Sequence, residues 1–143
     1  ISNELSQSEG IPIQKILPYF IMDYKYADII VCHNLDFDMK MIRIELLRNN
    51  YGDLIQNINK DTYCTMKNSI DLCAIERTNS MGKYFKYPKL IELHKKLFDT
   101  EPKNLHNSFN DVIVCLRCYY KLVHNEDFAN KSNTMKELMK LIM

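Results

Sequence analysis

Asp28-Ile-Ile-Val-Cys-His-Asn-Leu-Asp-Phe-Asp38 is the stretch that decides the fold of this 143-residue chain. After Asp28 comes a short apolar, β-branched run that ends at Cys32, which is typical of a strand covered on both faces in a parallel sheet. A polar turn follows, and helical spacing of apolar residues returns over residues 37–48. A strand that leads directly into a helix predicts an α/β fold, in which ligands lie beyond the carboxyl ends of the strands.

The rest of the chain is mainly helical in pattern. Pro88 favours a helix start at Lys89, and Thr134 with Glu137 forms a capping-box pattern for a last helix. We expect helices over residues 14–26, 68–77, 89–98, 106–123 and 134–143, a second strand over 63–66, and loops over 49–61, 83–89 and 100–105. Without repeats or an interdomain linker, residues 1–143 are predicted to form a single, partial domain in which residues 130–143 are a C-terminal helix.

Charge and cysteine content exclude several classes of protein. Nineteen basic against eighteen acidic residues give a net charge of +1, so nucleic-acid contact would need local patches or bound cations. No run approaches the roughly 18 apolar residues of a membrane span. The odd count of five cysteines predicts reduced thiols in a cytoplasmic, reducing compartment. Cys115 and Cys118 lie inside an apolar helical stretch, which predicts two core residues; zinc ligation by this pair is the alternative.

Two aspartates lie on apolar helix faces. Asp111 lines up with the apolar side of its helix, and Asp38 shares a face with Met41, just after the polar turn. A buried carboxylate is costly unless a cation or several donors meet it. The alternative for Asp111 is a capping role at the third position after an N-cap at Ser108. On one helix His106 and Asp111 would point roughly 140° apart, so they can share a site only if His106 precedes the helix.

Together these residues resemble a known family. His33-Asn-Leu-Asp-Phe-Asp38 resembles the second motif, H-N-x-x-F-D, of the DEDDh (DnaQ-like) 3′–5′ exonucleases, and His106-Asn-Ser-Phe-Asn-Asp111 resembles the third, H-x-x-x-x-D. Cys64-Thr-Met66 and Tyr87-Pro-Lys-Leu-Ile-Glu-Leu93 are similar to family segments in order and spacing. The family has a ribonuclease H-like fold and includes the proofreading subunit of bacterial DNA polymerase III.

The resemblance implies hydrolysis of phosphodiester bonds from nucleic-acid 3′ ends. It makes Asp38 and Asp111 ligands of two divalent cations, Mg²⁺ or Mn²⁺, and His106 the general base. Two such cations about 4 Å apart would activate water and stabilise the charge on the attacking and leaving oxygens. The implied partners are the single-stranded 3′ end of DNA or RNA and a DNA polymerase or another replication or repair protein.

Eight further residues are candidates for nucleic-acid contact. His33 and Asn34 are expected mainly to shape the turn. Phe37 is expected either to wall the terminal nucleotide or to pack in the core. The remaining residues, from the segment 83–89, combine positive charge with rings that can stack on bases; the alternative is that they form a solvated loop. The eight candidates are His33, Asn34, Phe37, Lys83, Tyr84, Lys86, Tyr87 and Lys89.

The family's first motif, Asp-x-Glu, should lie on a strand a few dozen residues before His33, and residues 1–32 do not hold it. We therefore expect an α/β, ribonuclease H-like exonuclease fold truncated at its N-terminus, with early strands missing and a helix-rich remainder. Such a chain should bind metal weakly and hydrolyse slowly. The alternative is a catalytically inactive exonuclease-like module that binds nucleic acid or protein, with residues 135–143 docking on a partner or packing on their own domain.

Overall fold

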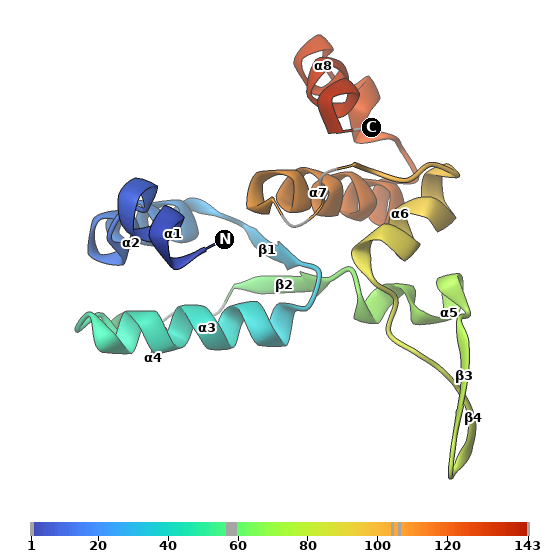
Figure 1. The fold of residues 1–143 in the computed structure, drawn as a ribbon, viewed down its shortest axis with the longest axis horizontal. Helices are drawn as coiled ribbons and strands as arrows, with labels where there is room; N and C mark the ends of the chain where they lie inside the picture. Colours follow the sequence, from blue (N-terminus) through green and yellow to red (C-terminus); the bar gives the residue numbers. More distant parts are fainter. Residues whose placement is uncertain (1, 57–59, 104, 106, 143) are drawn as a thin grey trace. The chain divides into compact units, whose positions relative to one another are not determined.

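The computed structural model describes residues 2–56, 60–103, 105 and 107–142. Helices alternate with short strands (Figure 1), and two small sheets accompany them, so the fold is broadly α/β, as predicted. Contacts divide the chain into two compact units. Unit 1 comprises Ile1–Ile30 and Asp36–Asp61; unit 2 comprises Val31–Leu35 and Thr62–Met143. The boundaries of a single domain over 1–143 stay a prediction.

Unit 1 is built from helices that present apolar faces to each other. Their bounds are α1 Asn3–Glu9, α2 Ile13–Tyr26, α3 Leu35–Arg48 and α4 Gly52–Gln56. Leu17 and Tyr24 of α2 and Leu46 of α3 are buried, as the 3.6-residue spacing requires. The predicted helices 14–26 and 37–48 are confirmed. The loop predicted for 49–61 is wrong in part, since this segment contains α4. The sequence did not indicate α4 because a helix of this length is too short to show a repeating apolar pattern.

The predicted strands form a two-stranded sheet. β1 (Ile29–Cys32) pairs with β2 (Asp61–Cys64), two residues earlier than the second strand was predicted. All four residues of β1 are only half-buried. The prediction of a strand covered on both faces is therefore wrong for this structure, because full cover on both faces would leave these residues buried.

Unit 2 contains the best-packed core. After a 3-10 turn, η1 (Lys67–Ser69), come α5 Ile70–Cys73, β3 Glu76–Asn79, β4 Gly82–Phe85, α6 Leu90–Phe98, α7 Ser108–His124, η2 Phe128–Asn130 and α8 Asn133–Ile142. Leu93, Val114, Cys118 and Ile142 form the central buried cluster. This burial confirms the core interpretation of the Cys115–Cys118 pair, since Cys115 is buried as well.

The C-terminal helix packs on its own unit. Met139 and Ile142 of α8 are buried, and the Lys103 N–H donates to the Ile142 carbonyl at 2.6 Å. The predicted capping box at Thr134 is wrong: the Ser132 hydroxyl accepts from the Met135 N–H at 3.1 Å, so the helix begins one residue earlier.

A β-hairpin occupies the segment where a helix end and a loop were predicted. The predicted helix 68–77 ends at Cys73, where Ala74 turns left-handed at φ 47°. β3 and β4 then pair antiparallel, with Gly82 at φ 122° after the tip. Their exposed, mostly polar residues lack the apolar alternation that marks a half-buried strand. The α6 helix starts at Leu90, so Pro88 lies before it rather than in its first turn.

Candidate functional site

The polar turn after β1 is only two residues long. β1 ends at Cys32 and α3 begins at Leu35, so only His33 and Asn34 connect the strand to the helix. Asn34 has φ 147°, in a region that side-chain-bearing residues seldom adopt. Residues in such sparsely populated backbone conformations are found more often at functional sites. The strand–turn–helix arrangement predicted for residues 28–48 is confirmed.

The His33 ring joins three distant segments of unit 2. Its Nε2 lies 3.1 Å from the Pro88 carbonyl oxygen and its Nδ1 lies 2.9 Å from the Thr65 hydroxyl oxygen. A carbonyl only accepts, so Nε2–H donates to the Pro88 carbonyl. The single proton of the Thr65 hydroxyl lies within reach of two acceptors, the Cys32 carbonyl oxygen at 3.2 Å and His33 Nδ1. We name His33, Thr65 and Pro88 the His33 bracket. Because both ring nitrogens are engaged, His33 shapes the turn, as predicted.

Thr65 is the buried hub of this bracket. Its backbone N–H donates to the Cys32 carbonyl at 2.9 Å, which continues the β1–β2 pairing by one residue. Its hydroxyl oxygen also lies 3.7 Å from the Cys115 sulfur of α7. The side chain is fully buried. Thr65 and Pro88 were not predicted as site residues, although both lie in segments that resemble the exonuclease family.

The predicted metal ligands occupy equivalent places on two helices. Asp38 lies in the first turn of α3, in unit 1, and Asp111 lies in the first turn of α7, in unit 2. Both are half-buried. The Ser108 cap is wrong: Asn107 is the N-cap, and its side chain accepts from the Phe109 N–H at 3.0 Å. His106, the predicted general base, lies outside the described residues.

The other nucleic-acid candidates differ in availability. Phe37 is 57% exposed, so the core alternative for this ring is wrong. Tyr84 and Tyr87 are also exposed, at 47% and 56%. Lys83 in β4 and Lys89, directly before the first residue of α6, are both exposed. Nucleic-acid contact by these residues stays a prediction.

Lys86 is committed to a carboxylate. Its ammonium lies 2.6 Å from both oxygens of Glu92, and only 19% of its side chain is exposed. Glu92 also accepts from the Lys89 backbone N–H at 2.7 Å. Burial favours the neutral acid, but these hydrogen bonds and the Lys86 charge outweigh it and lower the pKa of Glu92. Lys86 therefore holds the segment before α6 in place and has little charge left for a ligand.

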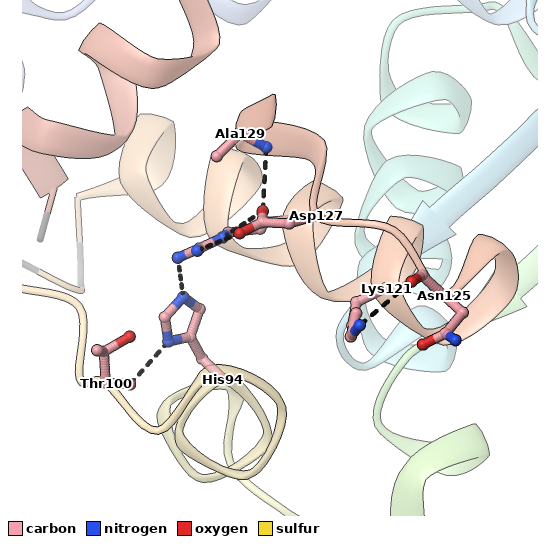
Figure 2. A network of polar contacts seen from close by, with 7 residues as sticks. His94, Thr100, Lys121, Asn125, Asp127 and Ala129 are labelled. Carbon is pink, nitrogen blue, oxygen red and sulfur yellow. Dashed lines mark hydrogen bonds and ion pairs between the residues drawn. The ribbon is translucent and has the colours of Figure 1, made fainter. Parts of the chain in front are cut away.

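A buried polar network, missed by sequence reasoning, connects α6, α7 and η2 (Figure 2). Arg117 donates to both carboxylate oxygens of Asp127, at 2.9 and 2.7 Å, and to His94 Nε2 at 3.0 Å. His94 Nδ1–H donates to the Thr100 carbonyl at 2.9 Å. Asp127 also accepts from the Ala129 N–H, which caps η2. The charged Arg117 within the apolar stretch 112–123 was the available signal.

The electrostatics of this network favour a structural role. Burial lowers the pKa of His94, and the nearby Arg117 charge acts in the same direction. The hydrogen bond from Arg117 lowers the pKa of Asp127. The Arg117 guanidinium also stacks 3.9 Å from the Phe98 ring centre. His94 has no exposed surface, so it is out of reach of a substrate and serves to hold the helices together.

The residues that the structure describes contain neither a group of three metal-ligating side chains nor a helix able to cross a membrane. Burial raises the pKa of the Cys118 thiol, which disfavours the thiolate that zinc binds. Within residues 2–56, 60–103, 105 and 107–142, no three His, Cys, Asp or Glu side chains gather in a way that could hold a metal ion. In the same ranges, no helix combines the length and the apolar character needed to cross a bilayer.

Comparison of the chain with protein-family models, with curated proteins and with solved structures gave no match.

Proposed function

We propose that this protein is a metal-dependent 3′–5′ exonuclease with a ribonuclease H-like fold. It removes nucleotides from the single-stranded 3′ end of DNA or RNA. Asp38 and Asp111 serve as metal ligands and His106 as general base. The observation that carries the proposal is the His33 bracket.

The bracket supports the proposal because it joins three separate segments that were each selected for their resemblance to the same family. His33 belongs to the stretch that resembles the second family motif, and Thr65 and Pro88 belong to the two connecting segments that resemble the family. These segments are 32 and 55 residues from His33, so their convergence is not a consequence of local sequence. The hydrogen bonds fix the turn from which α3, with Asp38 in its first turn, starts.

The residue types fit a Mg²⁺ or Mn²⁺ site. Asp38 and Asp111 offer hard carboxylate oxygens, and Mg²⁺ in proteins often takes one or two carboxylates and keeps several waters. When bound, the cations supply a nucleophilic water and stabilise charge on the attacking and leaving oxygens. The Asp38 and Asp111 carboxylates hold and orient that site from the first turns of α3 and α7. A neutral imidazole at His106 takes the proton of the attacking water.

The test measures shortening of a 5′-labelled single-stranded oligonucleotide, with Mg²⁺ or with EDTA, by protein made from the complete reading frame. Asp38→Ala, Asp111→Ala and His106→Ala should each lower the rate by about a hundredfold or more. Asp36→Ala is the matched control, because Asp36 is an exposed acid in the same helical turn as Asp38 and should retain most of the activity.

A ladder of products that shorten from the 3′ end, abolished by EDTA, is the expected result. Undiminished activity in the three alanine variants would remove the proposed site. Binding of the oligonucleotide without any digestion would instead favour the alternative function, a catalytically inactive exonuclease-like module.

A further inference from the structure

The β3–β4 hairpin of unit 2 is exposed along its whole length. All eight strand residues are exposed, and Met81 at the tip is 92% exposed. In Figure 1 the hairpin follows α5 and is followed by the segment that leads into α6. A lone two-stranded hairpin is marginally stable in water, and the exposed ring of Tyr84 can stack on a ligand. The hairpin therefore has the properties of a binding element.

The strand register sorts the side chains onto two faces. Opposite residues of an antiparallel pair share a face, and successive residues alternate between faces. Arg77 lies opposite Tyr84, which defines the Arg77–Tyr84 face. The other face carries the opposed pairs Glu76 with Phe85 and Thr78 with Lys83.

Charge distinguishes the two faces. On the second face the Lys83 ammonium lies 3.4 Å from a Glu76 carboxylate oxygen, so the two charges offset each other. Neither strand places an acidic residue on the Arg77–Tyr84 face. Of the side chains that the structure describes, none forms an ion pair with Arg77. This face thus combines an uncompensated guanidinium with a ring that is 47% exposed.

We propose that the Arg77–Tyr84 face binds single-stranded nucleic acid. Tyr84 stacks on a base and Arg77 contacts a backbone phosphate, the two contacts that sequence-tolerant single-strand binding combines. The positive charge of Arg77 favours a nucleic acid as the ligand over an extended peptide that pairs with the strand edge. This inference rests on the proposed exonuclease function. The inference adds Arg77, which sequence reasoning did not select, and leaves Lys86 with a structural role.

The experiment measures fluorescence anisotropy of a labelled oligothymidylate with the whole chain, in EDTA so that no digestion occurs. Arg77→Ala and Tyr84→Ala should each weaken binding by about tenfold, whereas Tyr84→Phe, which keeps the ring, should bind like the parent. The hairpin supplies matched controls on its other face: Thr78→Ala and Phe85→Ala, which should change affinity less than twofold. Circular dichroism verifies that all variants remain folded.

The salt dependence separates the two contacts. Loss of one phosphate contact should lower the slope of log affinity against log salt by about 0.7 in Arg77→Ala, and Tyr84→Ala should leave the slope unchanged. Absence of binding by the parent chain, or equal losses from both faces, would overturn the proposal. Because binding is measured without metal, a failure of the exonuclease assay does not affect this result.

Discussion

Two of the ion pairs in unit 2 differ in burial, in distance and in the contacts around them. Arg117 and Asp127 meet at 2.7 Å with 12% and 24% of their side chains exposed, inside a hydrogen-bond network. Lys83 and Glu76 meet at 3.4 Å with 75% and 63% exposed, on an isolated hairpin. The first pair fixes helices in place and the second is solvated. The difference teaches that charge in this unit is structural where it is buried and available to a ligand where it is exposed.

The largest effect is expected from breaking the buried pair. Arg117→Ala leaves His94 Nε2 without its donor and the Asp127 carboxylate with the Ala129 N–H alone. Removal of one partner of a buried ion pair costs about 3–5 kcal/mol. Urea unfolding at pH 7.5 measures the change in the free energy of unfolding. Arg77→Ala on the hairpin is the control and should change it by less than about 0.5 kcal/mol. Similar losses in the two variants would contradict the comparison.

The buried network also predicts a pH dependence. The pKa of His94 is lowered in the folded protein, so the unfolded chain takes up a proton first as the pH falls below about 6.5. Stability is fully present above that pH and declines below it, by at most about 1.4 kcal/mol per pH unit for one group. Thermal unfolding between pH 7.5 and 5 measures this slope. His94→Gln should have a shallower slope; an unchanged slope would exclude His94 as its source.

Loss of one hydroxyl in the His33 bracket should have an intermediate effect. Thr65→Val keeps the side-chain shape but removes the hydroxyl that contacts both His33 Nδ1 and the Cys32 carbonyl, and loss of such a buried hydroxyl costs about 1–3 kcal/mol. Thr62→Val on β2 is the matched control, because Thr62 is exposed and β-branched residues suit strands. Chemical denaturation of both variants gives the difference, and equal stabilities would argue that the bracket contributes nothing.

The smallest effect is expected at the exposed pair. Glu76→Gln removes the charge facing Lys83, and such surface pairs contribute about 0–1 kcal/mol, less at high salt. Unfolding measured at low and high salt should hardly distinguish the variant from the parent. A loss of several kcal/mol would show that the hairpin is not the solvated element described above.

The sequence predicted elements with a strong periodic pattern and missed those without one. The β1 run and the amphipathic α2, α3, α6 and α7 were predictable from apolar spacing, and so was the burial of Cys115 and Cys118. The β3–β4 hairpin was not, because its exposed faces carry no apolar alternation.

The candidate site was predictable to a similar extent. His33 as a turn-shaping residue follows from its place after a strand. Its partners Thr65 and Pro88, and the His94–Arg117 contact, are tertiary contacts over 23 to 55 residues that no local pattern encodes.

The reach of the His33 bracket bears on the order of folding. Its bond to the Pro88 carbonyl closes a loop of 55 residues, so the closure entropy of that loop must be lost before the bond can form. The helical turns of α6 and α7 depend on near neighbours and can form earlier. Removal of the His33 ring should therefore accelerate unfolding and leave the refolding rate almost unchanged. The contacts of this imidazole would then form after the folding transition state and set the unfolding rate, which determines the lifetime of the native state.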